Sequence, residues 1–193
     1  GHATRCIPII NGLLKAGFEP ILASDGDALI LLQKAFPNLK SYQLPSYNIK
    51  YTKRENTLKL KLFLSIPSVL KAVKKEKKQV AEIIEKEQIS GLISDNRFGV
   101  FHTKTPSVYI THQLNVLSGI TTYFTSKIHQ KIASKYNEVW VPDIKGKTNF
   151  SGKLSNASFR VKFWKNFISR NRLPKKTKFI GILSRFHSEE KPI

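Results

Sequence analysis

Helix and strand patterns alternate twice within TRCIPIINGLLKAGFEPILASDGDALILLQKAFPNLKSYQL, residues 4–44. Thr4 can cap a helix that reaches Ala16. Pro8 would then fall in the first turn, where its missing N–H costs little, and Gly17 would end the helix. A strand, a helix and a weaker strand are expected next, over 18–23, 28–36 and 40–44. This order is typical of right-handed βαβ units, whose strands lie parallel in one sheet.

The alternation continues beyond residue 44. A long helical segment is expected over 57–88, kinked or split into two helices at Pro67. Its apolar residues recur at helical intervals: Leu62, Phe63, Ile66, Val69, Leu70, Val73, Val80, Ile83 and Ile84. Strands are expected over 91–94, 107–111, 138–141 and 179–182, with a helix over 120–136 and irregular or hairpin structure over 145–178. We therefore expect an α/β fold, with a Rossmann-like parallel sheet flanked by helices.

Length and composition suggest the domain organisation. The chain has 193 residues, of which 40% are hydrophobic, and this fits one domain with a sizeable core. We assign that domain to 1–183 and the beginning of an interdomain linker to 184–193. No uninterrupted apolar run is long enough to span a membrane, and the N-terminus lacks the order of a signal peptide. The single cysteine, Cys6, excludes an internal disulfide and fits a reducing cytoplasm.

The formal net charge of +20 predicts an anionic partner, such as nucleic acid, a lipid surface or a phosphorylated ligand. Two stretches carry nearly all of the excess. Residues 50–78 hold ten basic and two acidic residues, and residues 145–178 hold eleven basic residues and no acidic one. Within the second stretch, residues 159–167 alternate aromatic and cationic types. That pattern could stack nucleic-acid bases, lie in a lipid interface or form an ordinary amphipathic strand.

The first part of the 57–88 segment has the composition of a membrane-surface helix. Leu58, Leu62 and Phe63 are accompanied by Lys59 and Lys61. An apolar face bordered by lysines binds the interface of an anionic membrane, where each basic residue contributes about 1 kcal/mol. These residues predict a peripheral position on the inner face of the plasma membrane. The alternative is an apolar stripe in the core with a solvated lysine face.

Polar residues follow the predicted strands at the points where the strands end. They are Asp95, Asn96, Arg97, His112 and Gln113. Gly1 and His2 stand where the glycine-rich loop of a parallel α/β domain enters its first helix, a place that suits anions. Because open α/β sheets bind ligands at the carboxyl ends of their strands, we expect these residues to share one cleft.

Five motifs in this order resemble the N-terminal half of a bacterial GT-B glycosyltransferase. They are GHATRCIPIINGLLKAGFEPILASDG (1–26), SDNRFG (94–99), THQLN (111–115), EVWVPD (138–143) and NFSGKLS (149–155). The chain is similar to glycosyltransferase family 28, which includes the enzyme that adds N-acetylglucosamine to the undecaprenyl-pyrophosphate intermediate of peptidoglycan. The resemblance implies two Rossmann-like domains facing each other across a cleft, of which this chain is the first, acceptor-binding one. It also implies that the first strand precedes Gly1 and that the donor domain follows the IGILSRF motif (180–186), so that this part alone would be inactive.

The activity implied by the resemblance is transfer of a hexose or N-acetylhexosamine from a nucleotide sugar, such as a UDP-sugar, to a lipid-linked or cell-envelope acceptor. Such a transfer needs a base that takes the proton of the acceptor hydroxyl. His2 matches the family position assigned that role; its alternative is a hydrogen bond within a helix-start loop. Asp95 is the other candidate, as the base or as a residue that orients it. The alternative for residues 94–97 is a turn whose side chains bond locally.

The remaining candidates are acceptor contacts. The planar guanidinium of Arg97 suits a phosphate or a carboxylate. His112 and Gln113 can bond acceptor hydroxyls, although His112 can equally lie satisfied beneath the following helix. Gly1, Thr4 and Asn96 complete this predicted set. No group of histidine, cysteine and carboxylate residues has the spacing of metal ligands, so we expect no metal ion and no cofactor besides the donor as co-substrate.

Three other functions compete with glycosyl transfer. A nucleic-acid-binding module would use the basic stretches, but no aromatic RNA-binding signature or zinc-finger spacing occurs, so we expect no nucleic-acid partner. A membrane-surface interaction protein without catalysis would use the 57–88 segment. A sugar-nucleotide epimerase would use the same fold. The sequence leaves the oligomeric state open.

Overall fold

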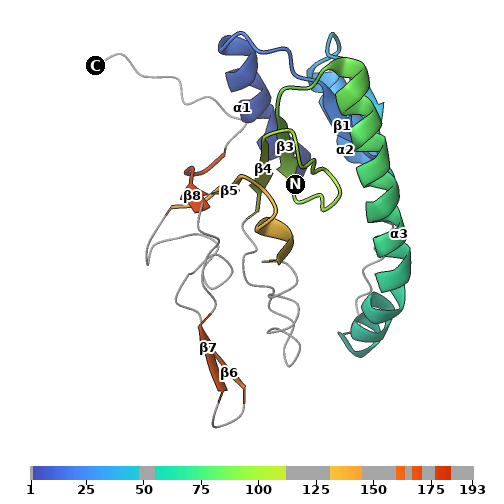
Figure 1. The fold of residues 1–193 in the computed structure, drawn as a ribbon, viewed down its shortest axis with the longest axis vertical. Coiled ribbons are helices and arrows are strands. Elements are labelled where there is room, and N and C mark those ends of the chain that lie inside the picture. Colours follow the sequence, from blue (N-terminus) through green and yellow to red (C-terminus); the bar gives the residue numbers. More distant parts are fainter. Residues whose placement is uncertain are drawn as a thin grey trace. The chain divides into compact units, whose positions relative to one another are not determined.

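The computed structural model describes residues 2–47, 55–111, 131–144, 160–163, 167–170 and 177–183, with side chains described in 3–47, 66–111, 131–144 and 177–183. The chain divides into two compact units. The first comprises Gly1–Ile89 and Arg185–Ile193, and the second comprises Ser90–Ser184. The elements of both are labelled in Figure 1.

The first unit contains helices and a small parallel sheet. In chain order its elements are α1 (His2–Lys15), β1 (Leu22–Ser24), α2 (Gly26–Ala35), β2 (Ser41–Gln43) and α3 (Glu55–Glu87). Strands β1 and β2 pair in parallel, with Leu22 opposite Ser41. The predicted helix–strand–helix–strand order is confirmed. Both strands are shorter than predicted, as Phe18 lies before β1 and is 58% exposed.

Gly17 ends α1 as predicted. Its φ of 80° lies in the left-handed region that glycine adopts without a steric cost. The N–H of Gly17 donates to the carbonyl of Leu14 (3.1 Å), and the N–H of Phe18 donates to that of Leu13 (3.0 Å). These two bonds form a Schellman motif, which satisfies carbonyls at the helix end.

The start of α1 differs from the prediction. The helix begins at His2, so Thr4 is its third residue and not its N-cap. Pro8 consequently lies in the second turn, beyond the positions that need no N–H donor, and the expected first-turn placement is wrong. The apolar side of the helix nevertheless packs, because Ile10 joins Leu22 and Leu32 in a buried cluster that includes partly buried Cys6.

Helix α3 is one continuous element with Pro67 inside it (Figure 1). Of the two predicted outcomes, the split into two helices is therefore wrong, and the kink at Pro67 stays a prediction. A series of its buried or half-buried residues recurs every three or four positions: Val69, Val73, Glu76, Val80, Ile84 and Glu87. Ile66 and Leu70, expected on this stripe, are 47% and 63% exposed. Among the described residues, no helix combines the length and the apolar character required to cross a membrane.

Side-chain hydrogen bonds fasten α3 to β2 and to the residues that follow it. Gln79 Nε2 donates to the carbonyl of Gln43 (2.7 Å). The hydroxyl of Tyr47 donates to the carboxylate of Glu76, which is fully buried. A buried carboxylate is costly unless hydrogen bonds compensate for its lost hydration, and Tyr47 supplies one of them.

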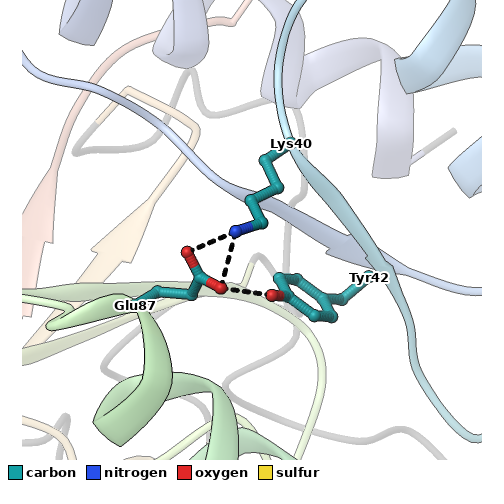
Figure 2. A network of polar contacts seen from close by, with 3 residues as sticks. All are labelled: Lys40, Tyr42 and Glu87. Atoms are coloured by element: carbon teal, nitrogen blue, oxygen red, sulfur yellow. Dashed lines mark hydrogen bonds and ion pairs between the residues drawn. The ribbon is translucent and has the colours of Figure 1, made fainter.

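A second fastening lies at the last turn of α3 (Figure 2). The Nζ of Lys40 donates to both carboxylate oxygens of Glu87, and the Tyr42 hydroxyl donates to the same carboxylate. Lys86 Nζ lies 5.6 Å from the centre of the Tyr42 ring, a cation–π distance. The network joins β2 to the end of the helix.

The second unit is built on a four-stranded, fully parallel sheet in the order β3-β4-β5-β8. Its strands are β3 (Leu92–Asp95), β4 (Ser107–Ile110), β5 (Glu138–Val141) and β8 (Thr177–Phe179). Strands β6 (Arg160–Phe163) and β7 (Phe167–Arg170) form a separate antiparallel pair, which confirms a hairpin within 145–178. Strand β8 begins two residues earlier than predicted. Of the helix predicted over 120–136, only residues 131–133 are described as helical.

The core of this unit gathers around β4. Tyr109 and Ile110 are fully buried, as expected for an inner strand of a parallel sheet covered on both faces. The Tyr109 ring stacks on that of Tyr136, with centroids 4.8 Å apart, and Phe101 meets Tyr136 edge-on at 5.3 Å. The α/β fold with parallel sheets is therefore confirmed.

Candidate functional site

The carboxyl edge of the four-stranded sheet brings four connections together within the second unit. Asp95 ends β3, Thr111 follows β4, Asp143 follows β5, and Gly181 follows β8. Hydrogen bonds continue the pairing just past the strand ends: Asn96 N to Ile110 O (3.1 Å), Thr111 N to Trp140 O (3.0 Å) and Gly181 N to Asp143 O (3.3 Å). Each connection therefore leaves the sheet in a defined register. In open α/β sheets this edge is where ligands bind.

The turn after β3 is held at the backbone carbonyl of Arg97. Ser94 Oγ donates to the Arg97 carbonyl (2.7 Å), and the Tyr136 hydroxyl donates to the same oxygen (3.0 Å). One donor comes from the strand before the turn and the other from a residue 39 positions away. The carbonyl of Arg97 is thus fixed from two sides.

Asn96 has a left-handed backbone conformation within the turn. Its φ of 55° places it in the left-handed region, which asparagine adopts more readily than most residues. Its side-chain Oδ1 accepts a hydrogen bond from the hydroxyl of Tyr109 (3.0 Å). Because its backbone N–H also donates to β4, Asn96 is held at both its main chain and its side chain.

This turn presents two half-buried charged residues at the carboxyl end of the sheet. Asp95 and Arg97 flank the fixed Asn96. Because the backbone between these two charged residues is fixed at Asn96, ligand binding costs less conformational entropy there. The predicted turn over 94–97 is therefore present, and its position at the ligand edge is compatible with the predicted binding role as well.

Two tyrosines that bond to the turn after β3 and an aspartate after β5 were not selected from the sequence. The hydroxyls of Tyr109 and Tyr136 donate hydrogen bonds to Asn96 and Arg97, which lie far from them in the sequence. Asp143 is 1% exposed, and its Oδ1 accepts the N–H of Ile144 (2.7 Å). The signal available for Asp143 was its place directly after a predicted strand, in the Pro142-Asp143 pair.

The structure places some of the predicted site residues together. Asp95, Asn96 and Arg97 share the edge with Thr111, the residue before His112. His112, Gln113 and Gly1 lie outside the described residues. His2 and Thr4 lie in α1, where the side chain of His2 is not described. A cleft shared by the Gly1-His2 pair and the two strand ends stays a prediction.

The predicted membrane-surface residues lie in the N-terminal half of α3. The backbone there is helical, whereas the side chains of Leu58, Lys59, Lys61, Leu62 and Phe63 are outside the described set. The membrane-surface role of these five residues therefore stays a prediction.

The chemistry available at the carboxyl edge is that of hydrogen bonding and charge. A guanidinium, carboxylates and hydroxyls are present, and in the described part of the chain no group of three or more histidine, cysteine or acidic residues could hold a metal ion. Comparisons with protein-family models, curated proteins and solved structures found no significant match.

Proposed function

We propose that this chain is the acceptor-binding domain of a nucleotide-sugar-dependent glycosyltransferase of the GT-B fold, similar to family 28. The transferred group is a hexose or N-acetylhexosamine from a donor such as a UDP-sugar, and the acceptor is lipid-linked or part of the cell envelope. The five motifs that resemble this family supply the reaction class. The parallel sheet of the second unit is the fold feature compatible with it.

The observation that carries the proposal is the fixed turn at the end of β3. Its sequence is the core of the SDNRFG motif, and three hydroxyls hold it, from Ser94, Tyr109 and Tyr136. These bonds hold Asp95 and Arg97 at the carboxyl end of the sheet, where open α/β sheets bind ligands. In the proposed site Arg97 binds an anionic group of the acceptor, because its planar fork matches phosphate or carboxylate oxygens.

The base in this proposal is His2, and Asp95 is the alternative. A neutral imidazole accepts a proton near neutral pH, so His2 can activate the acceptor hydroxyl as it attacks the anomeric carbon. If Asp95 is the base instead, the proton passes to a carboxylate at the end of β3. Thr4, Asn96, His112 and Gln113 are the proposed neighbours of the acceptor.

The test is sugar transfer by the complete gene product. We expect UDP release from UDP-sugars that depends on added membrane lipid extract. Arg97→Ala should raise the KM for the extract by at least about tenfold, because it removes one charge-assisted hydrogen bond to the acceptor. The control is Lys104→Ala, since Lys104 is exposed elsewhere in the same unit. Absence of acceptor-dependent release with every UDP-hexose and UDP-N-acetylhexosamine would overturn the proposal.

A further inference from the structure

Two buried tyrosines from different segments pack against each other in the second unit. Tyr109 lies in β4, and Tyr136 lies two residues before β5. Their rings are stacked with centroids 4.8 Å apart, and Phe101 packs edge-on against Tyr136. Tyr109 is fully buried and Tyr136 is 6% exposed. Phenylalanine at either position would supply the same apolar ring, so the presence of two hydroxyls in this core needs a separate reason.

The two hydroxyls donate to consecutive residues of the turn after β3. The Tyr109 hydroxyl lies 3.0 Å from Asn96 Oδ1, and the Tyr136 hydroxyl lies 3.0 Å from the carbonyl oxygen of Arg97. A buried hydroxyl costs free energy unless it forms a hydrogen bond. Both of these bonds go to the turn, so the burial of the tyrosine hydroxyls and the conformation of the turn depend on each other.

The backbone at both tyrosines is itself held by the sheet. Tyr109 lies in an inner strand, which pairs with β3 on one side and β5 on the other. The residue after Tyr136 is tied to the start of β4, because Asn137 N donates to the Ser107 carbonyl (2.9 Å) and Ser107 N donates to Asn137 Oδ1 (2.8 Å). The two hydroxyls are therefore fixed reference points for the turn.

The direction of Arg97 depends on the backbone at Asn96. Asn96 has a φ of 55°, in the left-handed region, where a residue with a side chain is held at a steric cost. A return of Asn96 to the ordinary right-handed or extended region would turn the chain that follows it and redirect Arg97. The bonds from Tyr109 and Tyr136 oppose that change on the two residues concerned.

We infer that Tyr109 and Tyr136 are positioning residues for the guanidinium of Arg97. The inference rests on the proposed function, in which Arg97 binds an anionic group of the acceptor. The tyrosines act through the turn and not by contact with the ligand. Without one hydroxyl the stacked rings remain, but the turn gains conformations, and part of the binding free energy is then used to order it. Anion binding at Arg97 should therefore weaken when either hydroxyl is removed.

The experiment measures protection of Arg97 from phenylglyoxal, a reagent for arginine side chains, by inorganic phosphate. Mass spectrometry of peptides from the complete gene product reports the modification of Arg97 separately from that of the other arginines. Potassium chloride at equal ionic strength is the reference, because a chain with a net charge of +20 attracts any anion. We expect phosphate to slow the modification in the wild type. The phosphate concentration for half protection should rise about fivefold in Tyr109→Phe and in Tyr136→Phe, the effect of losing one hydrogen bond.

The matched control is Tyr42→Phe, the same chemical change in the first unit, where the hydroxyl donates to the carboxylate of Glu87. It also removes one hydrogen bond but does not touch the turn, so half protection should stay within about twofold of the wild-type value. Circular dichroism checks that each variant is folded. The inference is overturned if phosphate does not protect Arg97 in the wild type, if neither Tyr109→Phe nor Tyr136→Phe weakens protection, or if Tyr42→Phe weakens it equally.

Sugar transfer separates this inference from the proposed function. In the UDP-release assay, Tyr136→Phe should raise the KM for the lipid extract about fivefold and leave kcat within about twofold, because a binding contact is weakened. A loss of folded enzyme would instead lower kcat and leave KM unchanged, and that result would count against a positioning role. Tyrosine-dependent protection of Arg97 without acceptor-dependent UDP release would overturn the proposed function and support the inference. UDP release with Arg97 unprotected would do the reverse.

Discussion

Lys40 Nζ lies 2.8 Å from both carboxylate oxygens of Glu87, although 47 positions separate the two residues. Lys40 is 55% exposed and Glu87 is 11% exposed. The hydrogen bond to Glu87 is the main cause that raises the pKa of Lys40. The bonds from Lys40 and then Tyr42 lower the pKa of Glu87. The pair therefore stabilises the contact between β2 and the end of α3 while both groups are charged.

Glu87→Gln should lower the melting temperature at neutral pH. Because the pKa of Glu87 is lowered by folding, its contribution is present above the ordinary carboxyl pKa of 4.5 and is lost as the pH falls through the folded value. The raised pKa of Lys40 has the opposite sign: its contribution is present below 10.5 and is lost at higher pH. Thermal melts extended below pH 4.5 and above pH 10.5 should show the difference between wild type and variant shrinking at both ends. Glu85→Gln, at an exposed position on the same turn, should show no such difference.

Tyr136→Phe should destabilise the protein by about 1 kcal/mol, because it removes one of the two hydroxyl bonds to the Arg97 carbonyl. Tyr109→Phe should cost a similar amount through Asn96. Urea denaturation measures both. Ser134→Ala is the control: its exposed hydroxyl donates to the Lys131 carbonyl three residues earlier (2.9 Å), so its loss should matter less. A control loss equal to that of Tyr136→Phe would contradict the assigned role.

Gly17→Ala and Gly12→Ala should have opposite effects on stability. Gly17 has a φ of 80°, so a Cβ there would cost about 1 kcal/mol even though no heavy atom lies within 4 Å of its position. Gly12 lies inside α1 with the same open space, and alanine there should add about 0.5–1 kcal/mol. Denaturant melts of the two variants give the comparison. Unchanged or raised stability in Gly17→Ala would show that the end of α1 is not held by its left-handed glycine, and lowered stability in Gly12→Ala would contradict the helix-propensity argument.

His2→Ala in the complete gene product should lower sugar-transfer turnover far more than it weakens donor binding. The reason is that a general base acts on the proton in the transition state and contributes typically about a hundredfold or more to the rate. Initial rates and donor titrations separate the two effects. Turnover close to that of wild type would move the role of base to Asp95, which Asp95→Asn then tests.

The order of helices and strands along the chain could be predicted from the sequence, because it depends on the local spacing of apolar residues. Gly17 as a helix end, the strand over Glu138–Val141 and the parallel pairing of β1 with β2 were all predictable from alternating apolar and turn residues. The start of α1 was misjudged because a threonine that can cap a helix can also lie within one.

Residues at the carboxyl edge were predictable only in part. Asp95 and Arg97 follow a recognisable strand, so their place at the edge could be expected. The Tyr109 and Tyr136 hydroxyls could not, because an aromatic residue in an apolar segment gives no sign of what its oxygen will meet. The burial of Glu76 could not be predicted either. A buried carboxylate on α3 needs a hydrogen-bond donor, and the sequence does not show that Tyr47 reaches it.

The sequence alone therefore determined the α/β class, the order of most elements and the polar residues that end β3. Those features follow from propensities and periods that act over a few neighbouring residues. Only the tertiary structure decided that Lys40 meets Glu87, that two distant tyrosines fix the turn at Asn96, and that Leu70 is exposed on α3. Each of these depends on segments far apart in the chain, or on which face of an element is covered, and no local pattern contains that information.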